Sequence, residues 1–187
     1  NSGVIEPLEM GIQKWENGRI IELNCYSIGL TGEIPESIGN LTELTQLGLK
    51  NNNLNGEIPE SIGNLTKLTQ LNLADNALSG SIPDTIGNLK SLTNLVLSNN
   101  EFTGSIPNII SNLTILHTFL ADSNNFSGTI PDEICTIYPN FIDYNLAYNK
   151  FCPPLPECID APEEEIKYQD CNCETGYNLL DGYCYSE

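Results

Sequence analysis

The sequence has few positive charges and almost no histidine. Lysine and arginine number seven against 25 aspartates and glutamates, which gives a net charge of −18. Proteins that bind nucleic acid or anionic membranes present basic surfaces, so we expect neither partner. No apolar run reaches the ~18–20 residues that a membrane-spanning helix needs. The chain opens at Asn1 without a signal peptide or an initiator methionine, so we expect a processed product without a membrane span.

Recognisable catalytic and metal-binding patterns are also missing. His117 is the single histidine, and no Cys-x-x-Cys pair occurs. The motifs of serine hydrolases, P-loop proteins and zinc-binding helices are absent. The acidic run Glu163–Glu165 lacks the alternating ligands of a calcium loop. We therefore predict a protein that is not an enzyme and that holds no metal and no cofactor.

A 24-residue repeat organises most of the chain. Each copy follows the frame Leu-x-x-Leu-x-x-Leu-x-Leu-x-x-Asn-x-Leu-x-Gly-x-Ile-Pro. A degraded first copy and a last copy with one inserted residue bring the total to six turns. The Ile-Pro dipeptide marks the period, with its prolines at Pro35, Pro59, Pro83, Pro107 and Pro131.

The frame predicts its own local structure. Leu-x-Leu alternates with a period of two, which indicates a short strand with one buried face, and stacked copies build a parallel sheet. The asparagine of the frame recurs at the same position of the repeat, directly after the strand, where its amide can satisfy buried backbone groups of the neighbouring turn. Glycine permits a bend in the backbone, and proline ends the extended segment.

This frame resembles the plant-specific class of leucine-rich repeats over residues 17–154. The resemblance implies an α/β solenoid that is mainly β: a right-handed superhelix with a parallel concave sheet, short convex 3₁₀ helices and a disulfide-stapled C-terminal cap. It also implies a second short strand near Gly-x-Ile-Pro. The class occurs in receptor-kinase ectodomains and in secreted inhibitors. We divide the chain into an N-terminal cap or arm (1–19), the solenoid (20–154) and an acidic, cysteine-rich C-terminal cap (155–187).

The N-terminal segment departs from the class. Trp15 and the following residues 17–20 resemble the end of the family's N-terminal cap, but the cysteines of that cap are missing. Two interpretations stay open: the segment folds over the first turn, or its apolar residues also pack on another subunit. The apolar assembly candidates are Val4, Ile5, Leu8, Met10 and Ile12.

Seven cysteines, six of them in the last third of the chain, favour disulfides and an oxidising, extracellular location, either secreted or on the cell surface. The exception is Cys25, which occupies a strand position where later turns have leucine. We expect Cys25 to be an unpaired thiol buried in the core.

Two family resemblances imply disulfide pairings in the tail. The segment 151–158 resembles the family's C-terminal cap, which implies Cys152–Cys158. The segment 171–184 resembles the second half of an epidermal-growth-factor-like module, which implies Cys173–Cys184. Cys135–Cys171 then follows by elimination only, among the 15 pairings that six cysteines allow. The tail is interpreted as a lid over the last turn, with an independent adhesive module as the alternative.

Four Asn-x-Ser/Thr motifs are candidate glycosylation sites: Asn40, Asn64, Asn112 and Asn125. The first three share one repeat position, so glycans there would line one flank. Asn88 shares that position but is followed by Lys90 and not by a hydroxyl residue.

The exposed columns of the concave face are mostly small and polar, and few of the aromatic or arginine anchors of protein interfaces occur there. The conspicuous contact candidates are Tyr26, Val96, Leu120 and Tyr148.

Two functions remain. We favour a non-catalytic extracellular glycoprotein that self-assembles through its ends into a homo-oligomer or fibre. The alternative is a recognition module that binds a protein, a peptide or an extracellular glycan, as the receptor ectodomains and secreted inhibitors do, and this alternative is an analogy from fold alone.

Overall fold

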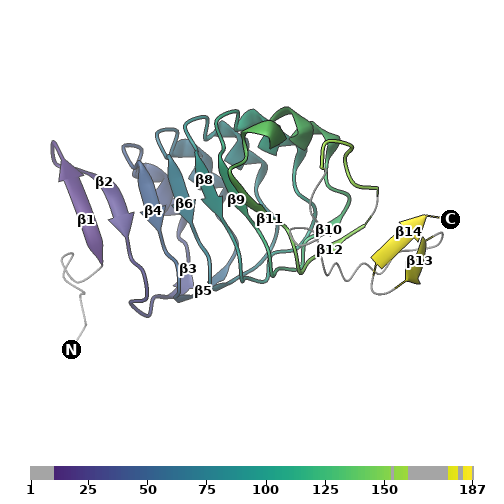
Figure 1. The fold of residues 1–187 in the computed structure, drawn as a ribbon. Coiled ribbons are helices and arrows are strands. Elements are labelled where there is room, and N and C mark those ends of the chain that lie inside the picture. The colour runs from purple at the N-terminus through teal and green to yellow at the C-terminus, as the bar shows by residue number, and fades with distance from the viewer. Residues whose placement is uncertain (1–10, 153, 160–176, 181–182, 187) are drawn as a thin grey trace.

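The computed structural model describes residues 11–152, 154–159, 177–180 and 183–186, and most of them form a solenoid (Figure 1). One seven-stranded sheet follows the length of the solenoid. Its antiparallel edge strand is followed by one parallel strand from each turn. In order across the sheet, the strands are β1 (Ile12–Glu16), β2 (Arg19–Asn24), β4 (Gln46–Gly48), β6 (Gln70–Asn72), β8 (Asn94–Val96), β9 (Thr118–Leu120) and β11 (Asp143–Asn145).

Short 3₁₀ helices form the convex part of each turn. Each of the first five begins directly after the proline of Ile-Pro; Pro59, for example, has φ −67° and ψ 145°, and the helix starts at the next residue. Proline suits this position because its ring fixes φ and its missing N–H has no helical partner there. The helices are η2 (Glu36–Asn40), η3 (Glu60–Asn64), η4 (Asp84–Asn88), η5 (Asn108–Asn112), η6 (Asp132–Thr136) and η7 (Tyr138–Asn140).

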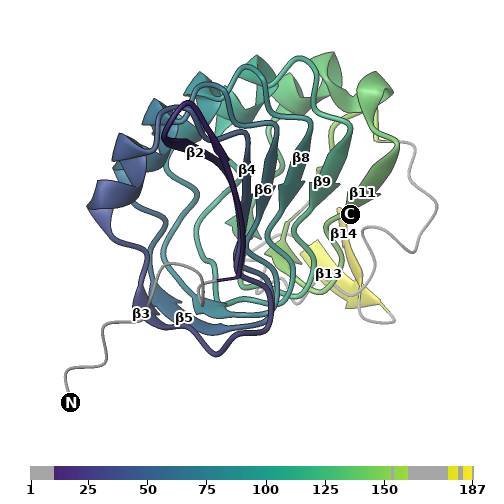
Figure 2. The same ribbon diagram turned by 90° about the vertical axis from the view of Figure 1, so that its left-hand side faces the viewer.

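Short parallel strands occur near Gly-x-Ile-Pro, as the family resemblance implies. They are β3 (Thr31–Glu33), β5 (Asn53–Gly56), β7 (Ala77–Leu78), β10 (Ser127–Gly128) and β12 (Lys150–Phe151). Figure 2 shows β3 and β5 at the end of the turns opposite the helices. A separate antiparallel hairpin pairs β13 (Tyr177–Leu180) with β14 (Tyr183–Ser186). The predicted solenoid with a parallel sheet and 3₁₀ helices is confirmed.

The core is filled by the repeated leucines and isoleucines, which the register stacks from turn to turn. Leu71, for example, pairs with Leu47 on one side and Leu95 on the other. Toward the C-terminal end the frame's later leucine becomes phenylalanine. Phe126 stacks between Phe102 and Phe151 with ring centroids 5.9 and 6.2 Å apart.

The predicted role of the frame asparagine is confirmed: its amide bonds backbone groups of the neighbouring turn, and the five asparagines form a ladder along the solenoid. Asn100 donates from Nδ2 to the carbonyl oxygens of Leu73 and Leu97 at 3.0 Å. Its Oδ1 accepts a hydrogen bond from the backbone N–H of Leu78, also at 3.0 Å. The same bonds connect the other turns, through Asn52, Asn76, Asn124 and Asn149. The ladder is structural, and it satisfies backbone groups that the turn buries.

The N-terminal end is a β-hairpin. Strand β1 pairs antiparallel with β2 and is the edge of the sheet, and Lys14 forms an ion pair with Glu22 at 2.9 Å. Of the assembly candidates, Ile12 lies on this edge strand and is 72% exposed. The other four, Val4, Ile5, Leu8 and Met10, lie outside the described residues.

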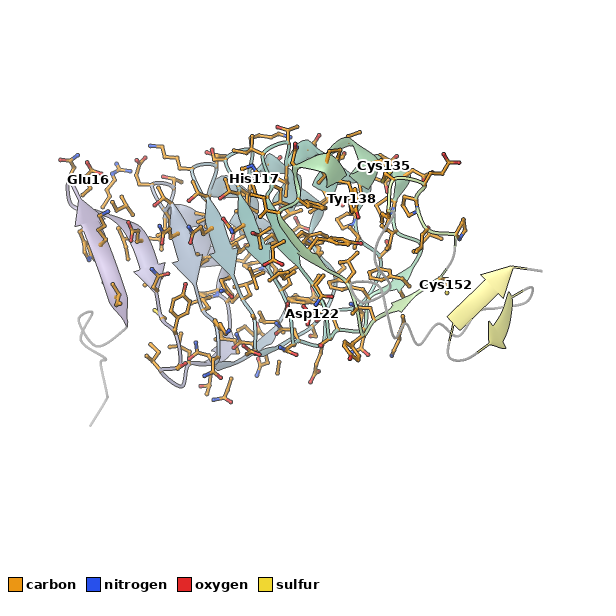
Figure 3. The ribbon with its side chains drawn as sticks, in the orientation of Figure 1. Glu16, His117, Asp122, Cys135, Tyr138 and Cys152 are labelled. Atoms are coloured by element: carbon orange, nitrogen blue, oxygen red, sulfur yellow. A yellow bond between two sulfur atoms is a disulfide. The ribbon has the colours of Figure 1, made fainter. Side chains whose placement is uncertain are left out.

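The disulfide at the C-terminal end of the solenoid differs from the two pairings predicted there. Cys135 on η6 is bonded to Cys158, with 5.5 Å between their Cα atoms. Cys152 continues the line of β12, where its N–H donates to the carbonyl of Gly128 at 2.8 Å. This bond places Cys152 far from Cys135 across the last turn (Figure 3).

The chain crosses the end of the solenoid after Cys152 and brings Cys158 to the helical side. The predicted pairs Cys152–Cys158 and Cys135–Cys171 are therefore wrong. The third predicted pair, Cys173–Cys184, includes Cys173, which lies outside the described residues.

Replacing both Cys135 and Cys158 by serine should lower the free energy of unfolding by about 3 kcal/mol, since the bond closes a loop with a sequence separation of 23 residues. Urea unfolding of the double variant measures this loss. A non-reducing peptide map of the unmodified protein is the companion measurement. A map that joined Cys152 to Cys158 would contradict the assignment.

Candidate binding surface on the concave face

The outer face of the seven-stranded sheet is polar along most of its length. In each strand the central residue points into the core, so the residues before and after it face outward. Strand β6 shows the pattern, with Gln70 exposed, Leu71 buried and Asn72 half-buried. Further amides face outward from other strands of the sheet at Gln46, Asn94 and Asn145.

Two of the predicted contact residues form one apolar pair in this polar face. Val96 on β8 and Leu120 on β9 are direct neighbours in the parallel register. Both are half-buried, so part of each side chain is open to solvent. Asn72 flanks the pair on one side and Asn145 on the other. The pair is thus a small apolar surface bordered by groups that donate and accept hydrogen bonds.

Tyr26 lies on the same face near its N-terminal end. A Cβ atom at Gly48 would lie 2.3 Å from Tyr26 Oη and 2.4 Å from the ring, so the ring occupies the space that the glycine leaves. The ring is 44% exposed and stays available for contact. Since Gly48 lies two strands before Val96, Tyr26 is separate from the apolar pair.

Tyr148, the last predicted contact residue, lies in the turn after β11 and is 56% exposed. Its φ is 55°, in the left-handed region, as at the equivalent positions of earlier turns such as Asp75 and Asn99. The structure therefore brings Val96 and Leu120 together and places Tyr26 and Tyr148 in the first and last turns.

Polar residues border the face at both ends of its strands. His117 and Asp122 lie at opposite ends of β9 (Figure 3), and His117 is exposed. Asp122 accepts a hydrogen bond from the hydroxyl of Ser98 at 2.6 Å. Nearby, Asp75 pairs with Lys50 at 3.5 Å. These contacts pair the two carboxylates with a hydroxyl and an ammonium group beside the face.

Sequence reasoning missed two exposed apolar residues in the segments that connect a 3₁₀ helix to the next strand of the sheet. Ile115 is 45% exposed and Ile142 is 84% exposed. The backbone N–H of Ile142 donates to the carbonyl of His117, so Ile142 continues the column formed by Thr69 and Thr93. The signal was present in the sequence, because an isoleucine replaces a polar residue in that column.

Ionisable groups outside this face have local causes for their pKa shifts. A hydrogen bond from Lys67 lowers the pKa of the Glu43 carboxyl. The bond to Glu22 raises the pKa of the Lys14 ammonium group. Burial raises the pKa of the Cys25 thiol, which is 3% exposed in the core as the sequence predicts.

Within the described residues, no group of three or more histidine, cysteine, aspartate or glutamate side chains could hold a metal ion. A helix long and apolar enough to cross a membrane is likewise absent from that part of the chain.

The four candidate glycosylation sites lie in two settings. Asn40, Asn64 and Asn112 are the last residues of η2, η3 and η5; the first two are exposed and Asn112 is half-buried. Asn125 is half-buried just before β10, and its N–H donates to the carbonyl of Phe102.

Comparison with known proteins agrees with this geometry. The family described as leucine-rich repeat region matches residues 12–136. The ectodomain of the receptor kinase GASSHO1/SCHENGEN3 from Arabidopsis thaliana, in complex with CASPARIAN STRIP INTEGRITY FACTOR 2, is 35% identical with a TM-score of 0.76, over 81% of this chain and 19% of that one. The Arabidopsis receptor kinase HAESA, in complex with an extended IDA peptide hormone ligand, is 32% identical with a TM-score of 0.74, over 84% and 26%.

A chain of the Arabidopsis BIR3–SERK2 complex is of similar length. It is 38% identical with a TM-score of 0.64, over 78% of this chain and 77% of that one. By contrast, this chain spans only about a fifth of the GASSHO1/SCHENGEN3 ectodomain. A search of curated proteins finds no match. The chain belongs to the leucine-rich-repeat family, in the type found in plant receptor ectodomains.

Proposed function

We propose that this protein is an extracellular recognition module that binds a peptide or an extended segment of a protein on the concave face. The observation that carries the proposal is the Val96–Leu120 pair, an apolar site in the middle of an otherwise polar and open sheet face. Apolar contacts supply binding energy, and the bordering amides supply orientation.

The comparisons support recognition in preference to self-assembly. HAESA is in complex with a peptide hormone, and a SERK protein is in complex with BIR3. These are properties of those proteins, and this chain covers only part of the HAESA ectodomain. The fold supports a protein that presents a surface for contact and does not catalyse a reaction.

The charges around the face suggest the chemistry of the partner. Asp122 and Asp143 lie beside the strands that carry the apolar pair, and the whole chain has a net charge of −18. Like charges across an interface disfavour binding. We infer a neutral or basic peptide with an apolar side chain that contacts Val96 and Leu120.

The test is selection from a displayed library of random peptides against the protein. The enriched peptides are then measured against Leu120→Lys, which places a charge at the centre of the site. We expect a loss of affinity of at least about tenfold, since a buried unpaired charge costs more than 1.4 kcal/mol. The matched control is Ala77→Lys, an exposed residue of β7 in the other sheet, which should bind as the unmodified protein does.

Equal binding by Leu120→Lys and the unmodified protein would contradict the proposal that peptides bind on the concave face. Self-assembly through the ends stays a prediction, as does an extracellular glycan as the partner. Light scattering over a concentration series separates assembly from recognition, because a mass that stays that of one chain at every concentration excludes fibres and oligomers.

A further inference from the structure

The N-terminal end of the solenoid carries an open cleft that the concave face does not include. It has a volume of about 220 Å³ and lies between the β1–β2 hairpin and the end of η2. The hairpin contributes Trp15, and the segment after η2 contributes Leu41. The indole of Trp15 is 58% exposed, although tryptophan carries a large apolar surface that proteins usually cover.

The same cleft is lined by a glycosylation motif. Asn40, Leu41 and Thr42 all border it. Leu41 is half-buried and packs against the core, whereas Asn40 and Thr42 on either side of it are exposed. The acceptor amide and the hydroxyl that the motif requires are therefore both at the surface.

We propose that Asn40 carries an N-linked oligosaccharide whose first sugar packs against Trp15 in this cleft. In the transfer, a bond forms between Asn40 Nδ2 and the anomeric carbon of the sugar. The bond between that carbon and the pyrophosphate oxygen of a polyprenyl-linked oligosaccharide donor breaks. The amide loses one proton, and the polyprenyl pyrophosphate leaves with the bonding electrons.

The lining of the cleft fits a hexosamine. The C–H face of a pyranose is apolar and matches the face of an indole, while its hydroxyl and acetamide groups need polar partners. Arg19 and Glu43 line the cleft beside Trp15 and provide a donor and an acceptor. The sugar would thus cover the exposed indole and leave its own polar groups paired.

The other helix-end motifs lie at the same position of their turns, without a tryptophan beside them. Leu65 and Leu113 are fully buried between Asn64 and Thr66 and between Asn112 and Thr114. We extend the acceptor role to Asn64 and Asn112. Trp15 is the single tryptophan of the chain, so only the sugar on Asn40 has an indole beside it.

Because the chain has one tryptophan, its fluorescence reports on this cleft alone. The protein is produced in a eukaryotic secretory host, and glycopeptide mass spectrometry counts the sugars. Thr42→Ala should lose the glycan on Asn40, shift the emission to longer wavelength and raise the acrylamide quenching constant about twofold, because the indole loses its cover.

Two variants serve as controls. Thr42→Ser keeps the motif while changing the same side chain, and it should retain both the glycan and the emission. Lys90→Thr completes the motif at Asn88, the equivalent helix end in η4, and should add a glycan without changing the fluorescence.

A bare Asn40 in the glycopeptide map would overturn the proposal. So would unchanged quenching after Thr42→Ala or after enzymatic removal of the glycans, since the indole would then be open or covered by another segment or a second copy of the chain.

Discussion

Asn100→Ala should lower the free energy of unfolding by about 4 kcal/mol, although the change removes no apolar contact. Asn100 is 8% exposed and bonds Leu73, Leu97 and Leu78. Alanine would leave the buried N–H of Leu78 without its partner, at about 1–3 kcal/mol. The carbonyls of Leu73 and Leu97 would each lose one of two amide hydrogen bonds, at about 1 kcal/mol each, and would keep those from Asn76 and Asn124. Urea unfolding followed by circular dichroism measures the loss.

The control for this change is Asn55→Ala. Asn55 is exposed on β5, and its loss should alter stability by less than about 0.5 kcal/mol. If Asn100→Ala also changed the free energy of unfolding by less than about 0.5 kcal/mol, water would be replacing the amide. The asparagine ladder would then not be the main interaction that stabilises the stacking of turns.

Phe126→Ala should cost a similar amount, about 4 kcal/mol, through loss of packing. The ring is fully buried and stacks on Phe102 and Phe151, so alanine opens a cavity between two turns that cannot close without moving both. Because Phe151 begins the segment that leads to the Cys135–Cys158 bond, we also expect faster amide exchange at the C-terminal end of the solenoid.

Phe126→Leu is the matched variant. Leu54 and Leu78 occupy the same position in earlier turns, so leucine suits the backbone there, and the expected loss is about 1 kcal/mol. Equal losses for alanine and leucine would show that the stacked rings contribute something other than volume.

The strict period is why so much of the fold could be predicted from the sequence. Each leucine of the frame faces the core, and each frame asparagine has the same backbone partners one turn earlier, as Asn76 and Asn100 show. Local spacing determines these contacts because neighbouring turns lie in register.

Prediction was weakest where the period ends. The pairing of Cys135 with Cys158 depends on how the chain crosses the last turn, and no repeat describes that path. Family resemblance to a local Cys152–Cys158 bond was misleading, because Cys152 is still held by Gly128 in the line of β12.

The binding surface was only partly predictable. The alternation of strand residues placed Val96 and Leu120 on one face, and their register as direct neighbours agrees with it. The position of the Tyr26 ring over Gly48 depends on a side-chain orientation that spacing alone does not give.

The uniform register has a consequence for how such a chain can change in evolution. Suppose that the 24-residue unit containing Asn76 were deleted. Asn100 would then donate to the carbonyl of Leu49, to which Asn76 now donates, and no group in the asparagine ladder would be left without a hydrogen-bond partner. Gain or loss of one whole 24-residue unit therefore changes the length of the solenoid without changing the hydrogen bonds between neighbouring turns. The distance between Tyr26 and the Val96–Leu120 pair would then change in discrete steps, so the length of partner that the proposed binding face accommodates would change by whole units while the stacking of the core is kept.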